Sequence, residues 1–220
     1  MHCIILANGE IKDYEKYQAL FTDAPFTICA DGGIKHARKF NIIPRVVIGD
    51  LDSADPRCLE RLTAQGTSVL QYPRNKDELD TELALMEAVK RGATSITLLG
   101  CSGGRLDHTL AALQLMVPVA LQGISVQMLA QGHRVIVVIP GRPLVTPGEA
   151  GTILSMLPLT TCVRGITTRG VKWPLTNAVF ELGKPYGVSN EVTECEVRIS
   201  IEEGVLLVIE IAGGEEVECL

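Results

Sequence analysis

The feature that most constrains the fold of this 220-residue chain is a change in hydrophobic periodicity near Gly132. Before Gly132, short apolar runs alternate with segments of helical periodicity, a pattern that predicts βα units and a mainly parallel sheet. After it, the helical periodicity disappears and β-rich runs are separated by turns rich in proline and glycine. The sequence therefore predicts an α/β domain with an open parallel sheet over residues 1–132 and an all-β, sandwich-like domain over residues 133–220.

Within this scheme, individual strands and helices can be placed. The expected strands of the first domain are residues 3–7, 26–30, 45–48, 68–71, 95–99 and 125–129. One helix is expected over residues 80–91, with Leu83, Leu85, Met86 and Val89 facing inward, and another over residues 106–121, interrupted or ended by Pro118. In the second domain, strands are expected over residues 134–139, 152–156, 197–201 and 206–211, with turns at 141–143, 146–148 and 202–204.

Composition and charge exclude several classes of protein. No apolar run is long enough to cross a bilayer, so no membrane partner is expected. The first residues read directly into an expected strand and lack a basic leader, which predicts a cytoplasmic protein. The 26 acidic residues outnumber the 20 basic ones, which argues against sequence-independent binding to nucleic acid. If a nucleotide binds to this chain, cations must offset the negative charge.

Acidic residues gather in the turns after successive expected strands. Ligands of open α/β sheets bind outside the carboxyl ends of the strands, so these turns are where a site is expected. The acids are Asp31 after the second strand, Asp50 and Asp52 after the third, Asp77 and Asp80 after the fourth, and Asp107 after the fifth. Each acid taken alone has a structural alternative, because aspartate is a favoured helix N-cap and turn residue.

The pairing of the acids points beyond capping. An N-cap needs one oxygen acceptor, whereas Asp50 and Asp52 share one turn and Asp77 and Asp80 share another. Crowded carboxylates raise one another's pKa unless a cation shares the site. Oxygen ligands without a matching set of His or Cys favour Mg²⁺ over zinc, and Mg²⁺ typically binds one or two carboxylates together with substrate phosphates. We therefore predict an Mg²⁺ site that serves a phosphorylated substrate.

A glycine-rich turn over residues 100–105 leads from the fifth strand into the next helix. Its backbone N–H groups and the positive end of the helix dipole suit phosphate oxygens. Arg105 either forms a bidentate hydrogen bond with a phosphate or forms a surface ion pair with a neighbouring acid. The turn has neither the P-loop spacing nor that of the dinucleotide fingerprint. His108 is interpreted as a hydrogen-bonding residue at the helix start and not as a general base.

In their order along the chain, several segments resemble the thiamine pyrophosphokinase family. They are Asp31-Gly32-Gly33, Gly49-Asp50-Leu51-Asp52-Ser53, Lys76-Asp77-x-x-Asp80 and Gly103-Gly104-Arg105-x-Asp107-His108. The resemblance continues through residues 155–159, 168–175 and 187–191, so it covers nearly the whole chain, and the joint order of the segments is more specific than any one motif. One departure is Leu79, where the family often has threonine; in this chain a threonine, Thr81, follows the second acid instead.

The resemblance implies a transferase of the kinase type that moves the β,γ-diphosphate of ATP to the hydroxyl of thiamine and releases AMP. It implies Mg²⁺ as cofactor and a homodimer whose sites combine the α/β domain of one subunit with the β-domain of the other. By the same resemblance, Asp50, Asp52, Asp77 and Asp80 are catalytic, and Asp50, Asp52 and Asp80 hold the metal. The implied nucleotide-binding residues are Asp31, Gly32, Gly103, Gly104, Arg105, Asp107 and His108, and the implied thiamine-binding residues are Trp173, Ser189 and Asn190.

Several alternatives stay open at this stage. Trp173, the chain's one tryptophan, either lies against thiamine or packs in the core of the sandwich. Ser189 and Asn190 either hydrogen-bond the pyrimidine or build a turn. Two other functions are possible: diphosphate transfer to another hydroxymethyl heterocycle such as a pterin, against which the β-domain argues, and non-catalytic sensing of an Mg-nucleotide or of thiamine.

Overall fold

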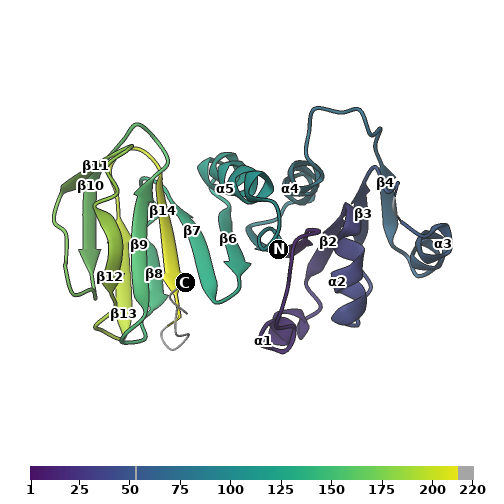
Figure 1. Ribbon diagram of the computed structural model, residues 1–220, viewed down its shortest axis with the longest axis horizontal. Helices are drawn as coiled ribbons and strands as arrows, with labels where there is room; N and C mark the ends of the chain where they lie inside the picture. Colours follow the sequence, from purple (N-terminus) through teal and green to yellow (C-terminus); the bar gives the residue numbers. More distant parts are fainter. Residues whose placement is uncertain (53, 213–220) are drawn as a thin grey trace. The chain divides into compact units, whose positions relative to one another are not determined.

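The computed structural model describes residues 1–52 and 54–212, so Ser53, in the acidic turn after the third strand, lies outside the described residues. The chain divides into two compact units, Met1–Gln131 and Gly132–Leu220 (Figure 1). Among the helices that the structure describes, none is long and apolar enough to cross a membrane. The two units are described one after the other.

The first unit is built on a parallel sheet whose strands lie in the order β6-β5-β1-β2-β3-β4. The strands are β1 (His2–Leu6), β2 (Phe26–Ala30), β3 (Val46–Gly49), β4 (Ser68–Gln71), β5 (Ser95–Leu99) and β6 (Ser125–Ala130). The chain adds β2, β3 and β4 on one side of β1 and then returns to place β5 on the other side. The strand order therefore reverses between β1 and β5, the position at which open α/β sheets bind their ligands.

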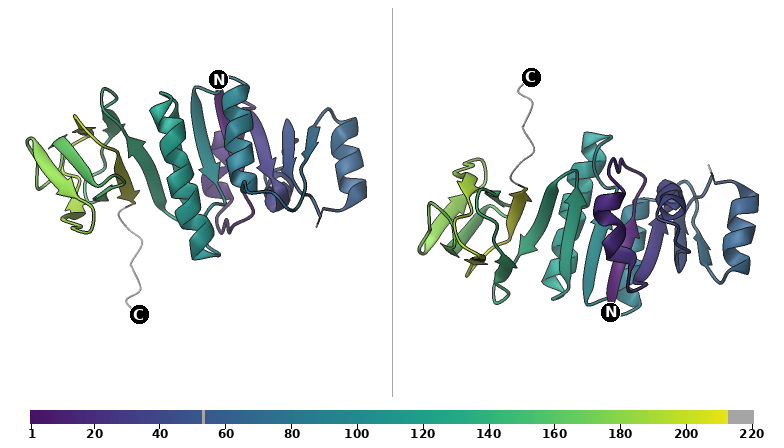
Figure 2. Two further views of the ribbon diagram at one scale, coloured as in Figure 1. Left: turned by 90° about the horizontal axis from the view of Figure 1, so that it is seen from above. Right: turned by 90° about the horizontal axis from the view of Figure 1, so that it is seen from below.

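Helices cover both faces of this sheet. They are α1 (Glu15–Gln18), α2 (Ile34–Lys39), α3 (Pro56–Ala64), α4 (Asp80–Lys90) and α5 (Leu106–Leu121), with the 3₁₀ turns η1 (Ala19–Phe21) and η2 (Asp31–Gly33). Helices α4 and α5 lie on one face, and α1 and α2 lie on the other (Figures 1 and 2). Ile4 and Leu6 of β1 belong to the same buried cluster as Phe21 and Phe40. The inner strands β1, β2, β3 and β5 are buried along most of their length, as parallel strands covered on both faces require.

Two details of the predicted helices are wrong. Pro118 neither interrupts nor ends α5, which continues through it. Pro118 and Gln114, whose carbonyl loses its helical partner, are both exposed, so water can satisfy that carbonyl. In α4, Leu83 and Leu85 face inward as expected, but Met86 is 57% exposed. The side of α4 on which Met86 lies depends on how the helix packs against the sheet, and the hydrophobic period of the sequence does not determine that.

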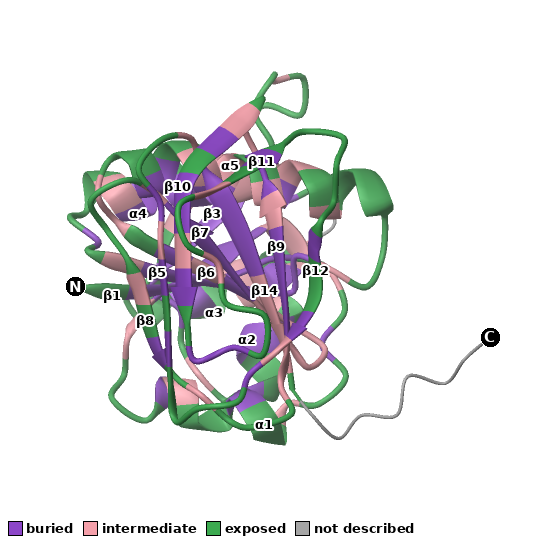
Figure 3. Ribbon diagram, turned by 90° about the vertical axis from the view of Figure 1, so that its left-hand side faces the viewer, coloured by how far each residue is buried: buried purple, intermediate pink, exposed green. Residues whose placement is uncertain are grey.

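The second unit is a sandwich of two antiparallel sheets. One has the order β12-β9-β14-β7, and the other has the order β11-β10-β13-β8. The strands are β7 (His133–Val138), β8 (Leu144–Pro147), β9 (Ile153–Pro158), β10 (Cys162–Arg169), β11 (Ala178–Glu181), β12 (Gly187–Glu191), β13 (Glu196–Ser200) and β14 (Leu206–Ile211). Side chains from both sheets, among them Met156, Ile166 and Val208, form one core. Buried residues run along β9 and β14 (Figure 3), and buried and exposed residues alternate along β13.

The predicted fold class, an open parallel sheet with helices followed by an all-β sandwich, is confirmed. The predicted turn over residues 146–148 is wrong, because Thr146 and Pro147 lie in β8 and pair with Val197 and Glu196 of β13. Strands β10, β11 and β12 were not expected from the sequence.

Candidate functional site

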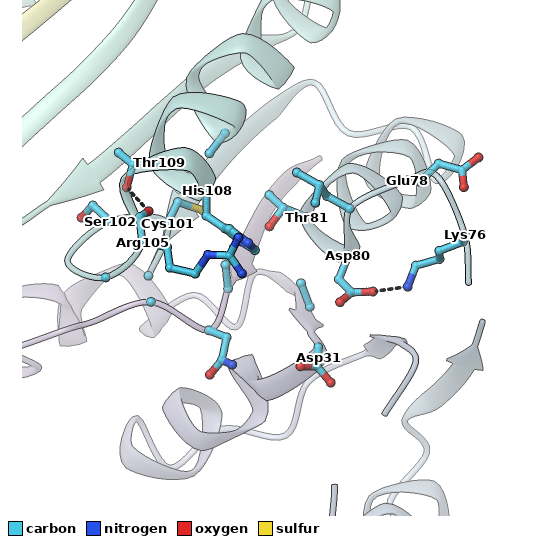
Figure 4. Close-up of a pocket in the computed structure, with 18 of the residues that line it drawn as sticks. Asp31, Lys76, Glu78, Asp80, Thr81, Cys101, Ser102, Arg105, His108 and Thr109 are labelled. Atoms are coloured by element: carbon cyan, nitrogen blue, oxygen red, sulfur yellow. Dashed lines mark hydrogen bonds and ion pairs between the residues drawn. The ribbon is translucent and has the colours of Figure 1, made fainter. Parts of the chain in front are cut away.

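A cleft of about 550 Å³ opens in the first unit at the carboxyl ends of its strands. Its lining comes from the segments that follow several strands: residues 7–9 after β1, Asp31 after β2, residues 74 and 76–79 between β4 and α4, the first two residues of α4, and residues of the turn after β5 and of α5. Figure 4 shows Asp31 and Asp80 on one side of the cleft and Arg105 and His108 on the other. The cleft therefore has an acidic side and a basic side.

On the acidic side, Asp31 and Asp80 converge on Gly49, the last residue of β3. A Cβ built on Gly49 would lie 3.1 Å from the Cβ of Asp31 and 3.2 Å from Oδ1 of Asp80. Gly49 also has a φ of +150°, which residues with a side chain rarely adopt. A glycine is thus required at the point where these two acids approach each other.

The surroundings of Asp31 disfavour its ionised form. Burial raises the pKa of its carboxyl group, and the charges of Asp80, Asp50 and Asp52 raise it further. Its Oδ1 is buried and has no hydrogen-bond partner among the described residues. The neighbouring acid, Asp80, is paired: Nζ of Lys76 lies 2.9 Å from its Oδ1 (Figure 4). The structure thus brings Asp31 to the acids expected to bind metal, although the sequence had grouped it with the nucleotide-binding residues.

The other expected acids occupy less central positions. Asp77 lines the cleft and is exposed, whereas Asp50 and Asp52 do not line it. Oδ1 of Asp50 accepts a hydrogen bond of 3.2 Å from the backbone N–H of Asp52. The carboxylate of Asp52 forms an exposed ion pair of 3.3 Å with Arg74, which itself lines the cleft. Asp50 and Asp52 are nevertheless near enough for their charges to act on Asp31.

The acidic side fits a hard divalent cation. Among the residues that the structure describes, no group of three His, Cys, Asp or Glu side chains could hold a metal ion by itself. Mg²⁺ typically uses only one or two protein carboxylates and completes its coordination with water and substrate phosphates. The convergence of Asp31 and Asp80 and the unpartnered buried oxygen of Asp31 meet that requirement.

On the basic side, the turn after β5 leads into the N-terminus of α5. Arg105 is the N-cap residue of α5, and its Nε donates a hydrogen bond of 3.1 Å to Oδ1 of Asp107. A second guanidinium nitrogen of Arg105 bonds Oδ2 of Asp107, and these bonds lower the pKa of Asp107 to about 2. Gly104, Arg105 and His108 line the cleft, but Asp107 does not. Arg105 thus forms the surface ion pair that the sequence left open, and it does so at the edge of the cleft.

Gly32 and Gly103 also do not line the cleft. Among the lining residues to which sequence reasoning gave no role are Asn8 and Lys76. Asn8 is the second residue after β1, so the rule that selected the other turns could have found it. Lys76 lies in the loop before α4 and forms an ion pair with Asp80, the first residue of that helix.

The second unit presents the residues expected to bind thiamine. Trp173 is 56% exposed, so it does not pack in the sandwich core. Asn190 is buried; its Oδ1 accepts a hydrogen bond of 3.1 Å from the backbone N–H of Trp173, and its Nδ2 donates one of 2.8 Å to the carbonyl of Trp173. Asn190 therefore fixes the segment that carries the indole. Ser189 is exposed, and its N–H donates a hydrogen bond of 3.1 Å to Oγ of Ser155.

Comparison with known families covers both units of the chain. Residues 17–128 match the model of the thiamin pyrophosphokinase catalytic domain, and residues 144–206 match that of the thiamin pyrophosphokinase vitamin B1 binding domain. The chain belongs to the thiamin pyrophosphokinase family. The family resemblance identified from the sequence is thereby confirmed.

Individual thiamin pyrophosphokinases are similar to this chain over most of their length. The thiamine pyrophosphokinase of Bacillus subtilis is 28% identical over 168 residues, which cover 76% of this chain and 78% of that protein. A crystal structure of the thiamine pyrophosphokinase from Bacillus subtilis superposes with a TM-score of 0.86 at 25% identity, over 97% of this chain and 100% of that chain. The Geobacillus thermodenitrificans structure superposes with a TM-score of 0.83 at 25% identity and covers 100% of both chains.

Proposed function

We propose that the chain is a thiamine diphosphokinase, which transfers the diphosphate of ATP to the hydroxyl of thiamine and yields thiamine diphosphate and AMP. Family membership supports the reaction and the substrate. The observation that carries the proposal is the cleft itself, in which the converging carboxylates of Asp31 and Asp80 face the glycine-rich start of α5 with Arg105. Such a cleft suits a triphosphate that arrives with a divalent cation.

In this reaction the hydroxyl oxygen of thiamine forms a bond to the β-phosphorus of ATP. The bond from that phosphorus to the oxygen bridging the α-phosphate breaks, AMP leaves with the electron pair, and the hydroxyl gives up its proton. Mg²⁺, when bound, would neutralise charge on the phosphate oxygens. The residues that would hold it are Asp50, Asp52 and Asp80, with Asp31 beside them and Asp77 at the edge of the cleft.

Positioning of the two substrates is expected to provide most of the rate enhancement. Fixing two reactants in attack geometry contributes on the order of 7–11 kcal/mol, more than a single general base at about 10²–10⁴-fold. Arg105 uses one edge of its guanidinium on Asp107 and keeps further N–H donors for a phosphate oxygen. Asp107 thus orients Arg105, while Gly104 and His108 complete the nucleotide side of the cleft.

We assign the thiamine side to Trp173. Its exposed ring can lie against the thiazolium or the aminopyrimidine, a contact worth roughly 0.5–2 kcal/mol when desolvated. Asn190 would act indirectly by holding the backbone of Trp173, and the exposed Ser189 offers a hydroxyl to the pyrimidine.

The direct test is to incubate the protein with ATP, Mg²⁺ and thiamine and to separate the products by chromatography. AMP and thiamine diphosphate are expected in equal amounts. Formation of ADP and thiamine monophosphate would reject diphosphate transfer. Binding of nucleotide and thiamine without release of AMP would instead identify a sensor. A hydroxymethylpterin used in place of thiamine is expected to give no AMP.

A homodimer with active sites shared between subunits is part of the proposal, and so is the cytoplasmic location. Light scattering of the purified protein measures the number of subunits. Mixed dimers of Asp80→Asn and Trp173→Ala subunits test the sharing, because each mixed dimer would hold one site with both lesions and one intact site. With random pairing, about one quarter of the wild-type activity should return at low thiamine concentration. No recovery in verified mixed dimers would place each site within one subunit.

A further inference from the structure

Side chains of helix α2 form hydrogen bonds with one side of the turn Asn8–Gly9, which follows β1 and lines the cleft. Nζ of Lys35 donates hydrogen bonds of 2.6 Å to the carbonyl of Asn8 and 2.7 Å to its Oδ1. Nε2 of His36, the next residue of α2, lies 2.9 Å from the carbonyl oxygen of Gly9. Neighbouring side chains of α2 therefore hold consecutive carbonyl groups of this turn.

The same turn is joined on its other side to the glycine-rich turn after β5. The N–H of Gly9 donates a hydrogen bond of 2.6 Å to the carbonyl of Gly100, and the N–H of Glu10 donates one of 2.9 Å to the carbonyl of Ser102. Gly100 and Ser102 line the cleft just before Arg105. A displacement of Gly9 would therefore reach the nucleotide side of the cleft through two backbone hydrogen bonds.

The hydrogen bonds of His36 determine its tautomer. A carbonyl oxygen can only accept, so Nε2 must carry the proton that bonds Gly9. The other ring nitrogen, Nδ1, lies 2.6 Å from the hydroxyl oxygen of Tyr14. In a neutral imidazole with Nε2 protonated, Nδ1 accepts, so the hydroxyl of Tyr14 must donate to it. The three residues form a directed chain from Tyr14 through His36 to Gly9.

The surroundings favour a neutral His36 and hold Tyr14 in place. His36 is 2% exposed, and burial lowers the pKa of its imidazole. The hydrogen bond to Gly9 acts in the opposite direction, but the charges of Lys35 and Lys39 add to the effect of burial, and the net direction is downward. The ring of Tyr14 packs against Phe40 with centroids 5.0 Å apart, and Nζ of Lys39 lies 4.7 Å from its centre. Neither Tyr14 nor His36 lines the cleft.

We propose that His36 is a positioning residue for the nucleotide side of the cleft, acting as the neutral Nε2–H tautomer that Tyr14 orients. It holds the carbonyl of Gly9 and, through Gly9, the glycine-rich turn that begins at Gly100. The effect on turnover rests on the proposed diphosphokinase activity, whereas the tautomer and the effect on nucleotide binding do not.

Variants of His36 separate positioning from simple burial. His36→Leu fills the space without any hydrogen bond, and kcat/KM for ATP is expected to fall roughly 10-fold to 100-fold, the scale of a small misplacement of reacting groups. The KM for thiamine should stay unchanged. In His36→Gln, the side-chain amide nitrogen takes the place of Nε2 and donates to Gly9, so most of the loss should be recovered. Tyr14→Phe, which leaves the bond to Gly9 but removes the orienting donor, should lie between wild type and His36→Leu.

The matched control is His2→Gln. Nε2 of His2 bonds Oγ1 of Thr97 at 3.0 Å, and His2 begins β1 at the end of the strand away from the cleft. This variant should behave as wild type. Thermal melts of every variant establish that it folds, and His36→Gln and Tyr14→Phe keep the test decisive if His36→Leu does not fold.

Two readouts remain valid even if the protein forms no AMP. Calorimetry with a non-hydrolysable ATP analogue should give the same order of affinities: wild type, then His36→Gln, then His36→Leu. Nitrogen-15 spectra of the imidazole rings, assigned by the signal missing in His36→Gln, should show the Nε2–H tautomer at neutral pH. The proposal would be overturned if the spectra showed an Nδ1–H tautomer or an imidazolium. It would also be overturned if a folded His36→Leu bound nucleotide as tightly as wild type, or if a folded His36→Gln bound it as weakly as His36→Leu.

Discussion

Replacing Gly49 by alanine would test whether the acidic side of the cleft depends on a residue without a side chain. The new Cβ would lie 3.1 Å from Cβ of Asp31 and 3.2 Å from Oδ1 of Asp80. Ordinary carbon contacts are about 3.5–4.0 Å, so both side chains would have to move by several tenths of an ångström. The φ of +150° adds backbone strain on the order of 1–3 kcal/mol. This strain should lower the Tm by roughly 3–15 °C for a unit of this size.

Activity should fall more than stability alone explains. A misplacement of about 1 Å can reduce turnover roughly 100-fold, so a shift of several tenths of an ångström should lower kcat by about tenfold. Gly66→Ala is the matched control, because Gly66 has a φ of +91° and open space around the position of a Cβ. It should lose stability through strain but keep its kcat. Circular dichroism melts and the initial rate of AMP formation measure the two effects. Equal kcat values in the two variants would refute the reasoning.

Further substitutions test the remaining roles. Asp80→Asn should abolish AMP formation while its melt shows a folded protein; near-normal turnover would remove Asp80 from the proposed metal site. Trp173→Ala should raise the KM for thiamine roughly 2-fold to 30-fold, the equivalent of a ring contact of 0.5–2 kcal/mol; an unchanged KM would mean that the indole does not touch thiamine. Asp31→Asn should make the metal-free protein more stable at neutral pH. Burial and neighbouring acids raise the pKa of Asp31 in the folded state, so its contribution to stability is present below the unfolded pKa and is lost as pH rises through the folded pKa. Melts of metal-free wild type and variant should therefore differ near neutral pH and converge in acid, and a constant difference would contradict this sign.

The strands of the first unit were predictable because a buried parallel strand is a short apolar run bounded by turns. The second unit was harder, because several of its strands lack a clean alternation. In β10 the register shifts between Val163 and Ile166, which breaks the two-residue period. In β12 a shift between Gly187 and Asn190 has the same effect. Irregular pairing of this kind is set by the partner strand, which a local pattern does not contain.

For the site, the sequence located the turns but not the distances between side chains. The position of each acid after a strand followed from chain order, since the carboxyl ends of parallel strands share one edge. The convergence of Asp31 with Asp80 depends on the backbone of Gly49, which belongs to a third segment. The exposure of Trp173 could not be inferred either, because tryptophan side chains are highly buried on average. Only the tertiary fold determines that this indole lies in solvent.

The exposed indole also provides an intrinsic fluorescence signal. Trp173 is the chain's one tryptophan, so light absorbed at the red edge of the ultraviolet band excites a single position. Because the ring is 56% exposed, its emission should respond to whatever covers it. Titration with thiamine, without any label, should therefore report occupancy at this position alone, and a parallel titration with nucleotide should show whether events in the first unit reach it.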